Sequence, residues 1–169
     1  MNLVEHLEVI ERWLDSVGVQ SDDLPEPVDT LLWEQIGKFF HRQLPSDLSL
    51  LYARHDGFPD WLYFFQTWLI VPATEILAAT QMLRVAFMPD NSPEAWRPDW
   101  LPFAADGAGN YLFLDLPTST INKFTHEGGY CEFLFNDLDA FLGQIASDIN
   151  EQLYSFQDYE VNYYGSVEL

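Results

Sequence analysis

The chain has 169 residues with 6 Trp, 8 Tyr and 13 Phe, enough apolar material for one domain spanning 1–169, which excludes a wholly disordered chain. Acidic residues outnumber basic ones by 27 to 7, for a formal charge of −20. So negative a surface repels nucleic acid and anionic membranes, and it either steers basic partners or keeps an aromatic-rich chain in solution.

The first third of the chain is predicted to be helical. Apolar residues recur every three or four positions over 3–17, which indicates one buried helical face. An acidic, proline-bearing loop separates this helix from a second one over 29–40. A third helix is expected to begin with Ser46 as its cap and to end at the turn formed by Asp56 and Gly57.

The middle of the chain changes from strand to helix. The segment 61–71, WLYFFQTWLIV, is aromatic and β-branched, so it is predicted to be a strand. Helical spacing returns over 72–87, with Thr74 as a possible cap. A loop over 91–98 follows.

The last third is predicted to contain two hairpins and a helix. The first hairpin spans 100–116 around a glycine-rich turn at 106–109, and the second reverses at 127–129. A last helix is expected to begin at residue 136 or 137 and to run to about 156. The pattern leaves the tail, 157–169, open between a strand and a flexible, frayed end.

The turn DGAGN could in principle hold a phosphate or a metal, but its context favours a structural role. No Lys follows the glycines, no third glycine completes a dinucleotide fingerprint, and Asp106, Asn110 and Asp115 do not match the EF-hand spacing. Gly107 and Gly109 can instead adopt positive φ, while Asp106 and Asn110 bond backbone N–H groups.

No set of residues in the sequence predicts an enzyme, a metal site or a bound cofactor. None of the four histidines forms the i, i+4 pair of a helical metal site: His6, His41, His55 and His126. The only cysteine, Cys131, excludes an internal disulfide and is expected to be a buried apolar thiol. With no signal peptide and no long apolar run, the expected compartment is the cytoplasm.

Aromatic residues are concentrated between Asp56 and Trp68. Strand alternation would place Trp61 and Tyr63 on one face, with Asp56 and Asp60 beside them. A strand buried on both faces explains this cluster without any function. The alternative is a partly exposed partner-binding patch made of Asp56, Asp60, Trp61 and Tyr63, because large aromatic residues are good interface anchors.

The order of four segments resembles the SUKH superfamily, which includes the yeast cell-wall assembly regulator (killer-toxin resistance) family and many bacterial immunity proteins. The segments are LPSDLSLLYARHDGF, LIVPATEIL, WLPFAADGAGNYLFLDL and FNDLDAFL, and together they define a core over about 44–142. The family usually has Asp where Asn110 stands. The residues that carry the resemblance are Leu44, Pro45, Gly57, Trp100, Pro102, Asp106, Gly107, Gly109 and Asn110.

The resemblance implies an α+β fold in which a bent antiparallel sheet packs with helices, including an N-terminal and a C-terminal helix. It also implies a non-catalytic protein-binding module without fixed catalytic residues. The expected function is that of an immunity protein that blocks a cognate toxin domain such as a basic nuclease. The alternative is a housekeeping scaffold or regulator of the cell-wall assembly type. Partner specificity is expected in the N-terminal helix and the tail, which lie outside the core.

Overall fold

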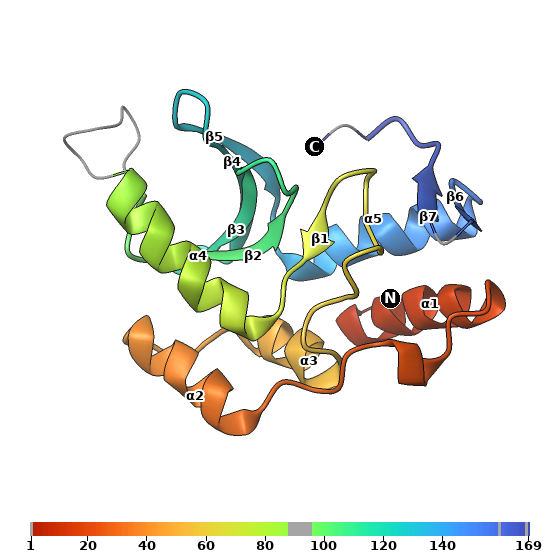
Figure 1. Ribbon diagram of the computed structural model, residues 1–169, viewed down its shortest axis with the longest axis horizontal. Helices are drawn as coiled ribbons and strands as arrows, with labels where there is room; N and C mark the ends of the chain where they lie inside the picture. The colour runs from red at the N-terminus through yellow and green to blue at the C-terminus, as the bar shows by residue number, and fades with distance from the viewer. Residues whose placement is uncertain (1, 88–95, 159, 168) are drawn as a thin grey trace.

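The computed structural model describes residues 2–87, 96–158, 160–167 and 169. Helices pack on a five-stranded antiparallel sheet, and a two-stranded hairpin follows the last helix (Figure 1). The predicted α+β class is therefore confirmed. Of the loop expected over 91–98, residues 91–95 lie outside the described part of the chain.

The helices are α1 (Leu3–Ser16), α2 (Thr30–Phe39), α3 (Ser46–Arg54), α4 (Ala73–Ala86) and α5 (Leu138–Asn150), with a short 3-10 helix η1 (Ser21–Asp23). The strands of the large sheet are β1 (Leu69–Ile70), β2 (Trp100–Ala105), β3 (Tyr111–Asp115), β4 (Thr120–Thr125) and β5 (Tyr130–Phe135). The hairpin consists of β6 (Tyr154–Gln157) and β7 (Glu160–Tyr163).

Helix α1 begins at a reciprocal cap and packs along α5 (Figure 1). The Asn2 side chain accepts hydrogen bonds from the backbone N–H groups of Val4 and Glu5, and the Glu5 carboxylate accepts one from the Asn2 N–H. The helix ends at Ser16, and Gly18 follows with a φ of +91°. The predicted first helix is thus present with its expected buried face.

Two predicted helix caps are wrong. Ser46 is the first residue of α3, and Pro45 occupies the N-cap position, where its fixed φ suits the entry into a helix. Thr74 lies inside α4, whose first N–H, that of Ala73, donates 2.6 Å to Oδ1 of Asp56. The cap of α4 therefore comes from a residue far outside its own sequence.

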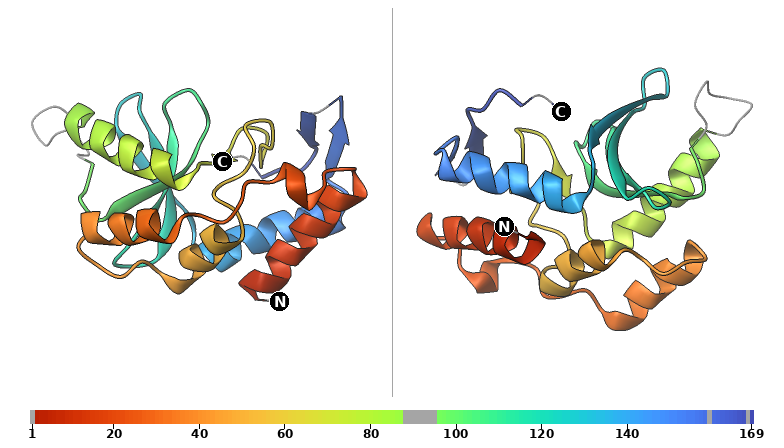
Figure 2. Two further views of the ribbon diagram at one scale, coloured as in Figure 1. Left: turned by 60° about the horizontal axis from the view of Figure 1, so that its bottom comes forward. Right: turned by 180° about the vertical axis from the view of Figure 1, so that it is seen from behind.

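The large sheet has the order β1-β2-β3-β4-β5, and all neighbouring strands are antiparallel. Its register shifts between Pro102 and Ala104 in β2, and between Ile121 and Asn122 in β4. Such irregularities increase local twist and bend a sheet. The bent antiparallel sheet that the resemblance implied is visible in Figure 2.

Apolar side chains pack on both faces of this sheet. On one face Trp100 stacks on Phe113, with ring centroids 4.3 Å apart, in a cluster that includes Leu83 of α4. On the other face Phe103 meets Phe141 of α5 at 5.7 Å. The sheet is therefore covered on both sides, and the helices are held to it by aromatic contacts.

The strand predicted over 61–71 is wrong except for β1. The chain instead forms a tight turn closed by a bridge between Phe64 and Trp68, in which Phe65 and Gln66 have φ values of +48° and +74°. Phe65 packs 5.8 Å from Phe141 and donates its N–H to the Tyr154 hydroxyl. These rings fill the space between α5 and the hairpin, so Phe64, Phe65 and Trp68 are buried without belonging to a strand.

The last helix ends at Asn150, earlier than predicted, and Gln152 turns the chain with a φ of +61°. The next residues pair as β6 and β7, so the tail contains a strand. Asp148 of α5 is 3% exposed and accepts hydrogen bonds of 2.8 Å from both Gln144 and the Tyr163 hydroxyl. This buried carboxylate connects the hairpin to α5.

Candidate partner-binding surfaces

The DGAGN turn is a structural element. Both of its glycines have positive φ, +75° and +99°, as the sequence predicted. Asp106 Oδ1 accepts hydrogen bonds from the N–H groups of Ala108 (2.8 Å) and Asn110 (3.1 Å). Asn110 Nδ2 donates to Asp106 Oδ2 over 2.6 Å, and Asn110 Oδ1 accepts the His126 N–H over 3.0 Å. The turn therefore joins the two hairpins.

Other residues that carry the family resemblance also lie in the framework. Leu44 and Trp100 are buried, 7% and 5% exposed. Gly57 has a φ of +76°, and a Cβ there would lie 2.7 Å from the backbone carbon of Val71. Leu44, Gly57 and Trp100 are thus enclosed in the fold, and a structural role for the signature as a whole stays a prediction.

Among the predicted partner-binding residues, Asp56 has a definite structural partner. It is half-buried and caps α4 through the Ala73 N–H. An acidic cap also interacts favourably with the positive end of the helix. The sequence did not predict this role, because the helix that Asp56 caps begins 17 residues further on.

The other three predicted residues lie on the segment between α3 and β1. Asp60 is exposed, while Trp61 and Tyr63 are half-buried. The Trp61 ring is 5.6 Å from that of Phe156 in β6. The structure thus places Asp60, Trp61 and Tyr63 in one segment beside the C-terminal hairpin, and their role in partner binding stays a prediction.

Positive charge is unevenly distributed over the molecule. The sequence has no Lys or Arg after Lys123. Among the described residues, four basic side chains lie within 4 Å of a carboxylate: Arg42 with Asp99 (3.2 Å), Arg54 with Glu11 (3.1 Å), Lys38 with Glu34 (3.9 Å) and Lys123 with Glu132 (3.9 Å). Many carboxylates are therefore left to give the surface its negative potential.

Three helices, α1, α3 and α5, begin around one open cleft of about 610 Å³, called here the acidic cleft. Its lining residues are Asn2, Leu3, Val4, Glu5, Asp47, Leu50, Asp137 and Asp139. Among the residues that the structure describes, no Lys or Arg lines this cleft.

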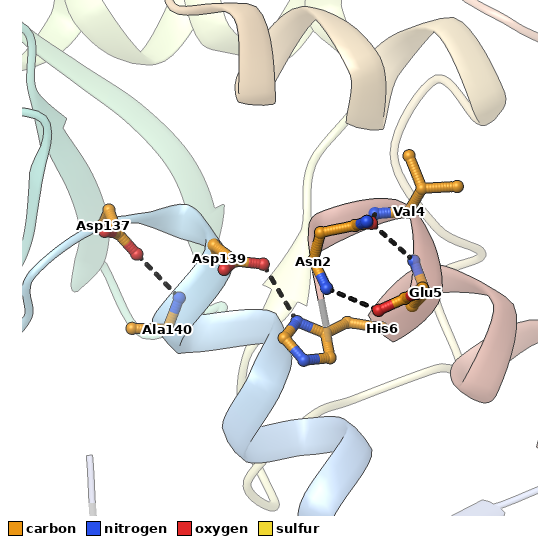
Figure 3. A network of polar contacts seen from close by, with 7 residues as sticks. All are labelled: Asn2, Val4, Glu5, His6, Asp137, Asp139 and Ala140. Carbon is orange, nitrogen blue, oxygen red and sulfur yellow. Dashed lines mark hydrogen bonds and ion pairs between the residues drawn. The ribbon is translucent and has the colours of Figure 1, made fainter.

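Three carboxylates of the acidic cleft, those of Glu5, Asp137 and Asp139, are held by hydrogen bonds near the starts of α1 and α5 (Figure 3). Asp137 Oδ1 accepts the N–H of Ala140 over 2.7 Å, as the N-cap of α5. Asp139 Oδ1 lies 3.0 Å from Nδ1 of His6, which links α5 to α1. Acidic residues in first turns are a recognisable sequence signal, but nothing in the sequence shows that these three helix starts meet.

No catalytic arrangement is apparent in the described part of the chain. Cys131 is half-buried rather than buried, because β5 is an edge strand that is covered incompletely. His55 contacts Pro25 O through Nδ1 (3.1 Å) and Glu11 Oε1 through Nε2 (3.3 Å), and so helps to hold the loop after η1. No described group of His, Cys, Asp and Glu could hold a metal ion, and no described helix has the length and apolarity to cross a bilayer.

The comparisons with known proteins agree with the resemblance seen in the sequence. A family match over residues 27–144 identifies the SMI1/KNR4 family (SUKH-1), whose members are generally non-catalytic and whose domains typically bind partner proteins. The match includes α2, α3, α4, the whole large sheet and the first part of α5, and leaves out α1, η1 and the β6–β7 hairpin. No curated protein matched the chain. Because the family match covers well over half of its length, the chain belongs to the SMI1/KNR4 family (SUKH-1).

Proposed function

We propose that this protein is an immunity protein, which binds a cognate toxin domain in the cytosol and blocks it by occlusion. The observation that carries the proposal is a formal charge of −20 on a member of a protein-binding family. Such a charge suits a basic toxin, for example a nuclease whose own surface is built to bind nucleic acid. The acidic surface would raise the rate of encounter more than the strength of the final complex.

The contact surface predicted from the sequence is part of this proposal. Trp61 and Tyr63 would act as aromatic anchors, with Asp60 and Asp56 at the rim. Half-burial in the free protein suits such a role, because the rings are already oriented and lose little freedom on binding. Tyr63→Ala is the sharper test of the two anchors, since Trp61 also packs on Phe156.

The test begins with the genes next to the one that encodes this chain. A neighbouring large reading frame with a short, basic C-terminal domain would supply the candidate toxin. We expect that domain to bind the chain with nanomolar affinity, and its expression to kill cells unless the chain is co-expressed. A related immunity protein with a different cognate toxin is the matched control.

The alternative, a scaffold or regulator with several weak partners, predicts a different result. In that case the neighbouring genes encode no toxin, or the basic domain binds only weakly and co-expression gives no protection. Tight binding with protection supports the immunity role, and weak binding without protection contradicts it.

A further inference from the structure

A groove between α2 and α3 offers an exposed apolar surface. This α2–α3 groove has a volume of about 660 Å³, and its apolar lining is formed by Trp33, Leu44, Leu50 and Ala53. Glu34 and Arg42 also line it, and the Arg42 guanidinium is paired with Asp99 at 3.2 Å. The Trp33 ring stacks on Tyr52 with centroids 4.8 Å apart, and its Nε1 donates to Ser49 Oγ over 3.2 Å. The indole is therefore fixed, so the floor of the groove is formed before any partner arrives.

The α2–α3 groove and the acidic cleft meet at one residue. Leu50 lines both, and its side of α3 is turned outward, with Leu50 itself 45% exposed. Val4, across the acidic cleft, is 38% exposed. The two hollows together form one surface with an apolar centre and an acidic side, called here the α3 surface. An apolar centre beside a charged rim is the usual anatomy of a protein interface.

The charge of the acidic cleft indicates which kind of partner can bind there. Three helix starts contribute about half a positive charge each. The cleft also contains four carboxylates, those of Glu5, Asp47, Asp137 and Asp139. Their total negative charge exceeds the positive charge of the three helix starts. The acidic cleft is thus expected to attract a cation and repel an anion. A second copy of the chain, itself charged −20, would be repelled from this surface.

We propose that the α3 surface binds a basic amphipathic segment of a partner protein. An apolar side chain of that segment occupies the α2–α3 groove beside Leu50, and Lys or Arg side chains on the next turn enter the acidic cleft. This inference rests on the proposed function and names the part of the partner that is recognised. It adds a second contact, on a different surface from that of Asp60, Trp61 and Tyr63.

The first experiment uses the full-length chain and two synthetic peptides. One is a 14-residue helical peptide with Leu at every third or fourth position and Arg between, and the other has the same charge with Ser replacing each Leu. We expect the Leu peptide to bind about tenfold more tightly, and to shift the backbone amide NMR signals of 47–53 and of the first turns of α1 and α5. Equal affinities, or shifts spread over all acidic segments or centred on 59–63, overturn the proposal.

Matched variants sharpen the result. Leu50→Arg should weaken the Leu peptide about tenfold, whereas Met82→Arg, a similarly exposed residue of α4 given the same charge, should not. Asp47→Asn should weaken both peptides a few-fold, whereas Asp60→Asn at the other surface should not. If the free chain dimerises and Leu50→Arg abolishes the dimer, the occupant is a second copy and the proposal is wrong.

Measuring how the toxin domain binds the variants distinguishes a failure of this inference from a failure of the proposed function. If the toxin binds the wild-type chain and Leu50→Arg equally well, the α3 surface is refuted while the immunity role stands. If no toxin binds but the Leu peptide still binds at α3, the immunity role fails while the surface is supported. Loss of toxin binding in Leu50→Arg, with Met82→Arg unaffected, supports both.

Discussion

At the scale of single residues, buried polar groups connect segments that the sequence does not relate. Asp148 is the clearest case, because its carboxylate is almost fully buried and is bonded by Gln144 and Tyr163. Burial, and then the hydrogen bond to Asp148, raise the pKa of Tyr163 to about 12. The phenol therefore keeps its proton in the folded protein at a pH where the unfolded chain has lost it.

The raised pKa of Tyr163 makes stability depend on alkaline pH. Well below pH 10 both states are protonated and the stabilisation is complete. As pH rises from 10 to 12 the folded state binds more protons than the unfolded state, so the free energy of unfolding falls. We expect Tyr163→Phe to cost about 1–3 kcal/mol at pH 7, because Asp148 loses a donor, and to flatten this decline. Urea denaturation at pH 7, 10 and 11 measures both effects.

The Tyr163→Phe experiment needs one control variant and has one expected background effect. Tyr164→Phe changes an exposed ring, 66% accessible, and should alter neither the stability nor its pH dependence. Burial also raises the pKa of Tyr52 and Tyr154, so some alkaline decline should persist in Tyr163→Phe. A decline as steep as that of the wild type would show that Tyr163 is not responsible.

Asp56 can be tested for its two roles at once. Replacement by Ala removes the acceptor for the Ala73 N–H and should cost about 1 kcal/mol of stability. Replacement by Asn retains an acceptor and should restore most of that loss while still removing the charge. Thermal unfolding measures the first effect and partner affinity the second. If Asp56→Asn binds the partner normally, Asp56 acts in the fold alone.

At the scale of elements, glycines that share a backbone conformation differ in what surrounds them. Gly57 and Gly107 have nearly equal φ, +76° and +75°. A Cβ on Gly57 would lie 2.7–2.8 Å from backbone atoms of Val71 and Pro72, whereas a Cβ on Gly107 has nothing within 4 Å. Replacing each of the two glycines by Ala therefore distinguishes the cost of backbone strain, which both sites share, from the cost of a steric clash, which only Gly57 has.

We expect Gly107→Ala to cost about 1–2 kcal/mol, the penalty for a left-handed conformation alone. Gly57→Ala should cost several kcal/mol more, or prevent folding, because the connection to α4 must move away. Circular dichroism with urea titration measures both. Similar losses at the two sites would mean that the segment around Val71 yields easily, contrary to its burial in the core.

The success of sequence reasoning also varies between elements. The helices and the two hairpins of the large sheet follow local signals, such as apolar spacing and Asp-Gly turns, and the sequence predicts them, although both cap residues it suggests are wrong. The strand predicted over 61–71 is wrong outside β1, because aromatic residues of this segment pack on α5 and β6 instead of pairing as a strand. The acidic cleft could not be predicted, since residues 2–5, 47–50 and 137–139 meet only in the folded chain.

At the scale of the whole molecule, α1 and the β6–β7 hairpin lie outside the family match, and both contact α5. Helix α1 lies along α5, and the β6–β7 hairpin is joined to α5 through Asp148. The Trp13 and Tyr154 rings, 5.8 Å apart, connect these two elements directly. Helix α1 also supplies one wall of the acidic cleft, so a segment outside the family match contributes to the proposed binding surface.

Because of the net charge, salt should change both the stability of the free chain and its rate of association with a partner. With 27 acidic and 7 basic residues, mutual repulsion destabilises the compact state, and salt screens repulsion between exposed charges. The exposed ion pairs that salt also weakens are worth only about 0–1 kcal/mol each. We therefore expect the melting temperature to rise as NaCl increases from 0.01 to about 0.15 M, where the screening length falls from about 30 to 8 Å.

The same screening should slow association with a basic partner, because long-range attraction accounts for much of the encounter rate. Stopped-flow association and thermal unfolding, measured over one salt series, thus should change in opposite senses. Choline chloride serves as the control, since it screens without offering a small cation that could bind a carboxylate cluster. A melting temperature that falls with salt would mean that specific ion pairs outweigh the repulsion. An association rate that does not change with salt concentration would show that the acidic surface does not steer the partner.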